Sequence, residues 1–308
     1  MMHYHNCKIS VNNESYKIIG KLGSGKKSKV YKALECSTNR LVAVKTQAFK
    51  ADSNVDSQKI YRQQFLTELW SLEKLLNNYR VVNLYNSELF DQKGSIVMEL
   101  GKSVPGVSRI SKYVKEPNRG VIWSDMVQAT ASVHREGIIH ADIKPQNFIM
   151  TNDGIKIIDF GYALPIDVHN HNCGHQVVSY FRGTIDYVSP EVLISKPFGI
   201  FSQKCDVWAL GCILFEMTFG KSYLDRLQYA FSIDKQNFII NAMNKLSIPM
   251  TKDEDLYDLI YRCLQLNPQN RPCIEQVLAH RYTHSLIHPY NWASSLNSLY
   301  SHHENTFL

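Results

Sequence analysis

The sequence predicts an α+β protein with two lobes, a small one built mainly of antiparallel strands and a larger one built mainly of helices. Residues 16–49 alternate β-branched or aromatic residues with polar ones between polar and glycine-containing turns, which is typical of antiparallel strands. From about Trp123 onward the pattern is mainly helical as far as "EQVLAHRY". A strand-rich first part and a helix-rich second part favour two lobes, joined near residues 99–102.

Each further element has its own pattern. One helix is predicted within residues 57–78 by five apolar residues at helical spacing: Phe65, Leu69, Leu72, Leu75 and Leu76. The stretches at 80–90 and 94–100 are predicted as two more strands. The apolar run "VWALGCILFEM" (207–217) is too short to cross a membrane, so we expect a buried helix there.

The composition, net charge and cysteine count limit the classes of protein to which the chain can belong. The 308 residues are 44% apolar and 20% charged, as in an ordinary globular protein. The net charge of +6 comes from dispersed basic residues, which does not favour a nucleic-acid-binding surface. Seven cysteines without a CxxC pair predict a reducing compartment, and the first ten residues lack the apolar run of a signal peptide. We therefore expect a soluble intracellular protein that binds neither nucleic acid nor membrane.

The segment "GKLGSGKKSKVYKA" (20–33) places Gly23 and Gly25 in a tight turn between two strands, with Ser28 as a third small residue. Small residues let backbone N–H groups approach phosphate oxygens because no Cβ intervenes. An ordinary structural hairpin would have the same pattern, so this segment alone leaves both interpretations open. The chain has no GxxxxGK[ST] sequence, which argues against a P-loop NTPase.

Lys45 lies within the apolar strand "LVAVKTQ" (41–47), where an unpaired charge is costly. Glu68 on the following helix faces the same way as Leu72 and Leu75 and could pair with this lysine. Such an ion pair fixes an ammonium group on the α- and β-phosphates of ATP. The alternative, equal on these residues alone, is a lysine that extends its ammonium into solvent at a strand end.

The segments "HADIKPQN" (140–147) and "IKIIDFG" (155–161) carry the strongest signal. Phosphoryl transfer needs an acceptor for the proton of the attacking hydroxyl, ligands for Mg²⁺ and positive charge on the moving group. Asp142 suits the first requirement, Asn147 and Asp159 the second, and Lys144 the third. A capped turn followed by a strand end is the structural alternative. The joint occurrence after a glycine loop and a strand lysine favours phosphoryl transfer.

With these motifs the chain resembles a eukaryotic protein kinase domain over residues 14–284. The resemblance implies the bilobal kinase fold, with an N-lobe at about 14–98, a hinge at 99–102, a C-lobe at 103–284 and a C-terminal tail at 285–308. It implies ATP and Mg²⁺ as cofactors, proteins as substrates, and Asn147 and Asp159 as metal ligands. The catalytic residues it implies are Asp142, Lys144, Lys45 and Glu68. The nucleotide-binding residues it implies are Leu22, Gly23, Ser24, Gly25, Lys26, Lys27, Ser28, Lys29, Val30, Ala43, Lys45, Met98, Glu99 and Gly101.

Further matches extend the resemblance. "YVSPEVL" resembles the end of an activation segment, whose Glu191 would pair with Arg271, and Asp206 would hold the backbone of the catalytic loop. "DIKPQN" resembles the serine/threonine version of that loop, in which Lys144 and Thr184 frame the acceptor hydroxyl. The apolar column that links the lobes in this family would consist of Leu72, Leu84, His140 and Phe160.

A finer resemblance is to the monopolar-spindle kinases of the spindle assembly checkpoint. It is carried by the joint occurrence of "LGSGKKSKVY", "TELWSLEKL", "IVMELG", "HADIKPQNF", "GTIDYVSPE" and "NPQNRPCIEQVLAHRY". It implies a serine/threonine kinase of dual specificity, kinetochore or spindle proteins as partners, and a nuclear or cytoplasmic location with kinetochore association. The alternatives are another cell-cycle or signalling kinase, and a nucleotide-binding pseudokinase that acts as a scaffold.

Most protein kinases carry an arginine where this chain has Ala141. That arginine binds an activation-segment phosphate, which a methyl group cannot do. Since the proton acceptor, the metal ligands and the phosphate lysine all remain, we expect an active enzyme that is controlled differently. Ser179, Tyr180 and Thr184 are the hydroxyl residues around the activation segment.

The same segment contains "HNHNCGH", in which His169, His171, Cys173 and His175 are residue types that bind Zn²⁺. Ligands two residues apart in a loop make a poor tetrahedral site, so a solvated polar loop is the expectation.

Overall fold

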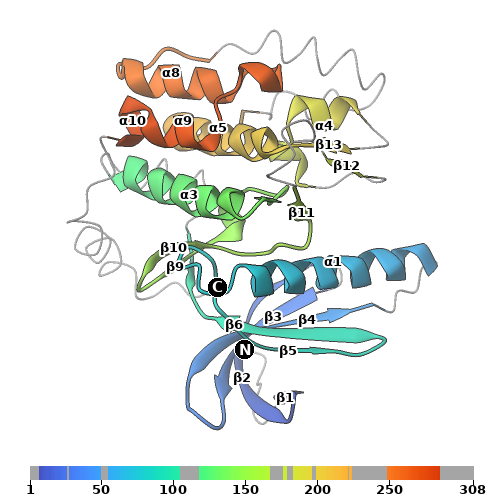
Figure 1. Ribbon diagram of the computed structural model, residues 1–308. Coiled ribbons are helices and arrows are strands. Elements are labelled where there is room, and N and C mark those ends of the chain that lie inside the picture. Colours follow the sequence, from blue (N-terminus) through green and yellow to red (C-terminus); the bar gives the residue numbers. More distant parts are fainter. Residues whose placement is uncertain are drawn as a thin grey trace. The chain divides into compact units, whose positions relative to one another are not determined.

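The computed structural model describes residues 7–25, 28–49, 55–104, 118–166, 176–178, 183–195, 199–220, 222–223 and 248–284. They belong to two compact units (Figure 1). The first contains the chain up to Lys102 together with Ile158–Gly161, and the second begins at Ser103. The first is a curled antiparallel sheet with one long helix and the second is mainly helical, so the predicted α+β class is confirmed.

The sheet of the first unit has six strands in the order β1-β2-β3-β4-β6-β5, and each neighbouring pair is antiparallel. Its strands are β1 (Lys8–Val11), β2 (Glu14–Ser24), β3 (Ser28–Glu35), β4 (Leu41–Ala48), β5 (Leu84–Leu89) and β6 (Lys93–Glu99). The strand predicted at 80–90 begins only at Leu84. One side of the sheet encloses a fully buried cluster: Val11, Tyr16, Ala33, Val42, Val44 and Val97.

Strand β1 is not among the sequence predictions. It forms a hairpin with β2 through Asn12 and Asn13, whose φ angles are 47° and 65°. Two left-handed residues in succession define the turn that suits a two-residue hairpin, and asparagine tolerates this conformation better than most residues. Asn86 on β5 donates to the carbonyl of Val11 (3.1 Å) and to the hydroxyl of Tyr16 (3.2 Å), so β1 is bound to the far edge strand of the sheet.

Helix α1 (Val55–Lys74) packs on the sheet along an apolar face that includes Phe65 and Leu72, which are 0% and 2% exposed (Figure 1). Because the helix ends at Lys74, the two leucines that follow lie in a turn. Leu75 is still buried, but Leu76 is 53% exposed. The prediction that helical spacing continues through Leu76 is therefore wrong.

The second unit is built around α5 (Gln203–Phe219), which is buried without interruption from Cys205 to Met217. Ser202 caps its start by accepting a hydrogen bond from the backbone N–H of Lys204, and Gly220 ends it in the left-handed conformation with φ 68°. The buried helix predicted at 207–217 is thus confirmed. No helix in the described part of the chain is long and apolar enough to cross a membrane.

The other elements of this unit surround α5. Helix α3 packs on α5 and α9, and α8 packs on α5 (Figure 1). The helices are α3 (Asn118–Arg135), α4 (Pro190–Ile194), α8 (Glu254–Cys263), α9 (Ile274–Ala279) and α10 (Arg281–His284), with short 3₁₀ turns at Pro145–Asn147, Ile185–Tyr187 and Pro268–Asn270. The short strands are β8 (Ile138–Ile139), β9 (Phe148–Thr151), β10 (Gly154–Ile157), β11 (Leu164–Pro165), β12 (Gln176–Val178) and β13 (Gly199–Phe201). Strand β7 (Lys102–Ser103), at the boundary of the units, extends the β9–β10 pair.

Candidate active site

The glycine-rich turn joins β2 to β3. The N–H of Gly25 donates to the carbonyl of Ser28 (2.9 Å), which closes the turn, and a Cβ added at Gly23 would meet nothing within 4 Å. A Cβ at Gly25 would approach the Ser28 hydroxyl to 3.0 Å. The surface of the turn near Gly23 is therefore open to a ligand, as phosphate binding requires. Lys26 and Lys27 lie outside the described residues.

Strand register gathers several predicted nucleotide-binding residues on one face of the sheet. Val30 is opposite Lys45, and Ala43 is opposite Met98. Because directly opposed residues in antiparallel strands share a face, and residues two apart on one strand do so too, these four side chains point the same way. Ala43 and Met98 are apolar residues and each is 7% exposed, so they form a buried apolar part of this face.

The remaining predicted residues flank this face. Leu22 is 47% exposed, and Ser24 and Lys29 are register partners beside the turn. The Glu99 carboxylate accepts from the backbone N–H (3.2 Å) and the side-chain amide (2.9 Å) of Asn83, which fixes the segment that leads to Gly101.

Lys45 lies at the centre of a charged triad in the first unit. Its ammonium donates to both carboxylate oxygens of Glu68 (2.8 and 2.7 Å) and to one oxygen of Asp159 (2.9 Å). The ion pair with Glu68, expected from the strand and helix patterns, is present. Asp159 has φ 65° and lies two residues after β10. Its side chain is 42% exposed, whereas those of Lys45 and Glu68 are 12% and 3% exposed.

Burial and charge act against each other in this triad. Burial opposes the charge of Lys45, but the carboxylates of Asp159 and Glu68 outweigh it and hold the pKa of Lys45 above its ordinary value. Burial raises the pKa of Glu68, and the Lys45 ammonium only partly offsets this. The lysine therefore stays charged.

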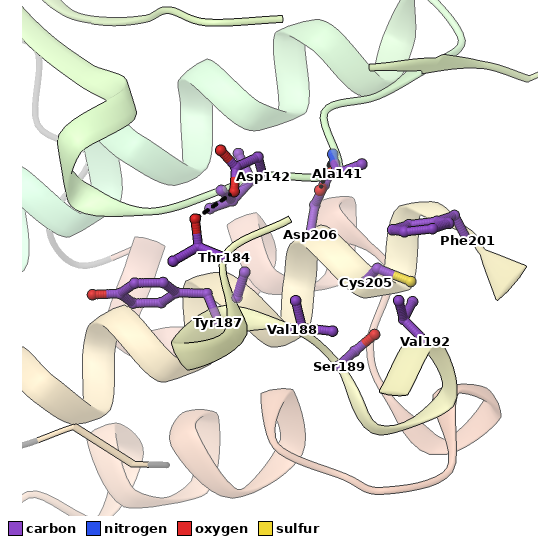
Figure 2. Close-up of a pocket in the computed structure, with 12 residues that line it drawn as sticks. Ala141, Asp142, Thr184, Tyr187, Val188, Ser189, Val192, Phe201, Cys205 and Asp206 are labelled. Carbon is purple, nitrogen blue, oxygen red and sulfur yellow. Dashed lines mark hydrogen bonds between the residues drawn. The ribbon is translucent and has the colours of Figure 1, made fainter. Parts of the chain in front are cut away.

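Asp142, in the second unit, has both of its carboxylate oxygens fixed. One accepts from the Thr184 hydroxyl (2.8 Å), and the other accepts from the Lys144 ammonium (2.6 Å) and the Asn147 amide (3.2 Å). Lys144 also donates to the Thr184 hydroxyl (2.8 Å), so the side chains of Asp142, Lys144 and Thr184 form a closed ring of hydrogen bonds. Asp142 itself is only 5% exposed. Figure 2 shows the Thr184 hydroxyl directed at Asp142.

Asn147 is oriented by a second hydrogen bond. Its side-chain N–H also donates to the Asp142 carbonyl (2.8 Å), and the residue is 3% exposed. Both bonds use the amide nitrogen, so the carboxamide oxygen is the atom that remains for a cation.

The backbone before Asp142 is held by the buried carboxylate of Asp206. One oxygen accepts from the His140 N–H (2.8 Å) and from the His134 ring (2.8 Å), and the other accepts from the Ala141 N–H (3.0 Å). Ala141 has φ 63°, a left-handed conformation that costs a residue with a Cβ about 1–2 kcal/mol. Asp206 lies in the first turn of α5, where the helix dipole favours a negative charge. The carboxylate thus stabilises a strained turn immediately before Asp142.

A second buried ion pair lies at the end of the predicted activation segment. The two terminal nitrogens of Arg271 donate to the two carboxylate oxygens of Glu191 (2.7 and 2.6 Å), and its Nε donates to the Gln265 carbonyl (2.7 Å). Burial works against the charge of Glu191, but Arg271 more than compensates, so the pKa of this carboxyl is lowered. The pairing expected between these residues is present.

A small cavity of about 20 Å³ lies behind the catalytic loop, lined by Ala141, Asp142 and Asp206 together with Ser189 and Cys205 (Figure 2). This space could hold about one water molecule. Burial, reinforced by the carboxylate of Glu191, raises the pKa of the Cys205 thiol, so this cysteine stays neutral and donates to Glu191 (3.3 Å).

The residues present fit a nucleotide and a hard cation. In the first unit, the partly exposed carboxylate of Asp159 is a ligand that Mg²⁺ accepts, and the glycine turn leaves room for phosphate oxygens. In the second unit, the oriented carboxamide oxygen of Asn147 is a ligand of the same kind. No group of three or more His, Cys, Asp or Glu side chains in the described ranges could hold a metal ion. His169, His171, Cys173 and His175, for which a solvated polar loop is the expectation, lie outside those ranges, as do Ser179 and Tyr180.

One supporting residue is not among the sequence predictions. His134 is 3% exposed and bonded to Asp206, and its own carbonyl accepts from the Gln203 side chain (2.8 Å). The sequence offered only a weak signal for it, because the last turn of α3 also contains the polar residues Ser132 and Arg135. The predicted column is buried at Leu72, His140 and Phe160, whereas Leu84 is only partly buried.

Comparison with known proteins agrees with this geometry. The family model "Protein kinase domain" matches residues 16–283. The dual specificity protein kinase TTK of Mus musculus is 31% identical over 91% of this chain, and the serine/threonine-protein kinase mph1 of Schizosaccharomyces pombe is 32% identical over 90%. The probable serine/threonine-protein kinase mps1 of Dictyostelium discoideum is 31% identical over 88%. The matches cover 33%, 44% and 28% of these relatives, so the chain spans less than half the length of each.

Proposed function

The chain belongs to the protein kinase family, and from this premise we propose that it transfers the γ-phosphoryl group of ATP to serine or threonine hydroxyls of proteins. The observation that carries the proposal is the Asp142 carboxylate, which is nearly buried and already accepts a hydrogen bond from a threonine hydroxyl. A carboxylate held in this way can take the proton of a substrate hydroxyl as that hydroxyl attacks phosphorus.

The other residues have complementary roles in this proposal. Lys144 supplies positive charge beside Asp142 and restrains its carboxylate. Lys45, fixed by Glu68, holds the nonreacting phosphates of ATP. Asn147 and Asp159 would bind Mg²⁺, which when bound neutralises charge that develops on the phosphoryl oxygens. Electrostatic positioning of this kind provides most of the rate in phosphoryl transfer.

The proposal is tested by measuring transfer of radiolabelled γ-phosphate to peptides that carry serine, threonine or tyrosine. Asp142→Asn should slow transfer by about 10²–10⁴-fold, the contribution typical of general-base catalysis. Asp91→Asn, the same change at an exposed aspartate, is the matched control. Mass-spectrometric mapping of the products identifies the acceptor residue type. A scaffold without catalysis would show no transfer in either the wild type or the control.

The cell biology follows from the finer resemblance. We propose that the kinase acts in the nucleus or cytoplasm on kinetochore or spindle proteins, and that it has dual specificity and a role in the spindle checkpoint. The support is the joint motif set together with relatives named TTK, mps1 and mph1. We also propose residues 14–284 as the catalytic domain, with the hinge at 99–102.

Met98 offers a direct test of that role. It is 7% exposed and directly opposite Ala43, so Met98→Gly would open space for an ATP-competitive inhibitor that is too bulky for the wild type. In cells that carry this allele, the inhibitor should abolish the mitotic arrest caused by a spindle poison. Persistent arrest, with loss of phosphorylation only on interphase proteins, would assign the enzyme to another signalling pathway.

A further inference from the structure

Helix α1 carries Glu68, so its position on the sheet decides whether Lys45 is paired. The sheet face that meets α1 is organised in rows of opposed residues. Lys45 of β4 is opposite Ile96 of β6, and Gln47 is opposite Gly94. The row of Lys45 and Ile96 contains the ammonium that donates hydrogen bonds to Glu68. The row of Gln47 and Gly94 lies two residues farther along each strand, so its side chains point to the same face of the sheet.

The second row makes two specific contacts with α1. The side-chain amide of Gln47, which is 7% exposed, donates to the backbone carbonyl of Tyr61 (2.9 Å). Gly94 leaves a notch that the fully buried Phe65 ring fills. A Cβ built at Gly94 would lie 2.4, 2.5 and 2.7 Å from three atoms of that ring, which is shorter than any normal contact.

The side wall of the notch is also fixed. The ring of Phe49 meets that of Phe65 edge to face, with centroids 5.6 Å apart. The backbone N–H of Phe49 donates to the carbonyl of Gln92 (2.8 Å), which fixes the loop that precedes Gly94. The ring of Phe65 therefore has little freedom to move sideways if the notch is filled.

From these contacts we propose that Gln47, Gly94 and Phe65, which we call the α1 seat, are positioning residues for the Lys45–Glu68 pair. Phe65 precedes Glu68 by three residues, so the two side chains lie on the same face of α1 less than one turn apart. The α1 seat fixes the height of the helix above the sheet one row away from Lys45. It holds Glu68 in bonding range through packing and one neutral hydrogen bond. The inference rests on the proposed kinase function and concerns the same site.

The decisive variant is Gly94→Ala. Restoring ordinary contact at 3.4 Å from 2.4 Å requires the Phe65 ring, and α1 with it, to move by about 1 Å. A displacement of this size at a catalytic group costs up to about 10²-fold in rate, so we expect kcat to fall by about 10- to 100-fold while the KM for the peptide changes little. Gly20→Ala is the matched control, because a Cβ at that position of β2 meets nothing within 4 Å.

A second substitution separates positioning from general damage. Phe65→Leu removes ring atoms that collide with the new Cβ, so the double variant Gly94→Ala/Phe65→Leu should be more active than Gly94→Ala alone. Hydrogen exchange of the α1 amides around Glu68 should accelerate in the single variant and slow again in the double variant. A double variant no more active than Gly94→Ala would overturn the proposal, as would a folded Gly94→Ala protein with wild-type kcat.

If Gly94→Ala does not fold, Gln47→Met tests the same seat. Methionine keeps the length of the side chain but cannot donate to the Tyr61 carbonyl, so we expect a loss of about fivefold in kcat, the equivalent of one hydrogen bond. Thr46→Val changes the neighbouring residue on the opposite face and should leave kcat unchanged. A Gln47→Met protein equal to wild type in kcat and in α1 exchange would contradict the α1 seat. A wild type without phosphotransfer would refute the proposed function instead, and hydrogen exchange would still test the seat.

Discussion

Replacing Asp206 with asparagine tests how the catalytic loop is held in place. The carboxylate accepts three hydrogen bonds, two on one oxygen and one on the other, and all three partners are donors. An asparagine has a single oxygen. If that oxygen serves His140 and His134, the amide N–H₂ faces the Ala141 N–H, and two donors meet in a site that is 1% exposed.

The expected loss can be worked from these contacts. An unsatisfied buried N–H costs about 1–3 kcal/mol, and the two remaining bonds lose the strength that an ionised acceptor gives them. We therefore expect Asp206→Asn to lower the free energy of unfolding by about 3 kcal/mol, or Tm by about 6–12 °C for a unit of this size. Since the anchored residues directly precede Asp142, kcat should fall as well.

The assay compares thermal unfolding and initial rates of wild type, Asp206→Asn and the exposed control Asp91→Asn. The control should match wild type in both. An Asp206→Asn protein within 1 kcal/mol of wild type and with unchanged kcat would refute the idea that this carboxylate holds the loop.

Three further changes test other parts of the site. Ala141→Gly relieves the left-handed strain at φ 63° and should raise the free energy of unfolding, measured by urea titration, by about 1 kcal/mol. The kcat, measured from initial rates, should not change, because the methyl group takes no part in transfer. Gly183→Ala should fold poorly or lose activity, because its φ is 96° and a Cβ there would lie 2.9 Å from the Ala141 carbonyl; a soluble, fully active variant would contradict that contact. Glu191→Gln should cost about 3–5 kcal/mol at neutral pH by breaking a buried pair with Arg271. In the wild type the pKa of Glu191 is lowered by folding, so the ion pair stabilises the protein above the unfolded pKa near 4.5, and this stabilisation is lost as the pH falls through the lower folded pKa. The difference in free energy of unfolding between wild type and variant, measured by denaturant titration, should therefore become smaller over that acid range.

Much of this site could be predicted because local periodicity carries it. The strand pattern placed Lys45 inside, the helical spacing put Glu68 on the inner face of α1, and their ion pair is present. Family membership, confirmed by the comparisons, was visible in short motifs whose spacing is fixed by the turns they form. The third member of the triad, Asp159, joins Lys45 across 114 residues, a contact that spacing along the chain cannot specify.

Other features depend on backbone conformation or on an absent side chain. Gln47 and Gly94 look like ordinary strand residues until the register sets them opposite one another under α1. Leu76 continues the apolar spacing, but the helix ends two residues earlier, and only the end of the helix decides its exposure. The Asn12–Asn13 hairpin did have a local signal in its two consecutive asparagines.

The most direct test of the central claim is the rate of γ-phosphate transfer from ATP to a serine/threonine peptide, measured side by side for wild type and Asp142→Asn. The wild type should transfer phosphate in the presence of Mg²⁺, and the folded variant should be slower by at least about 100-fold. Equal rates for the two proteins would contradict the catalytic role of Asp142. No transfer by the wild type would contradict the assignment of the protein as an active kinase.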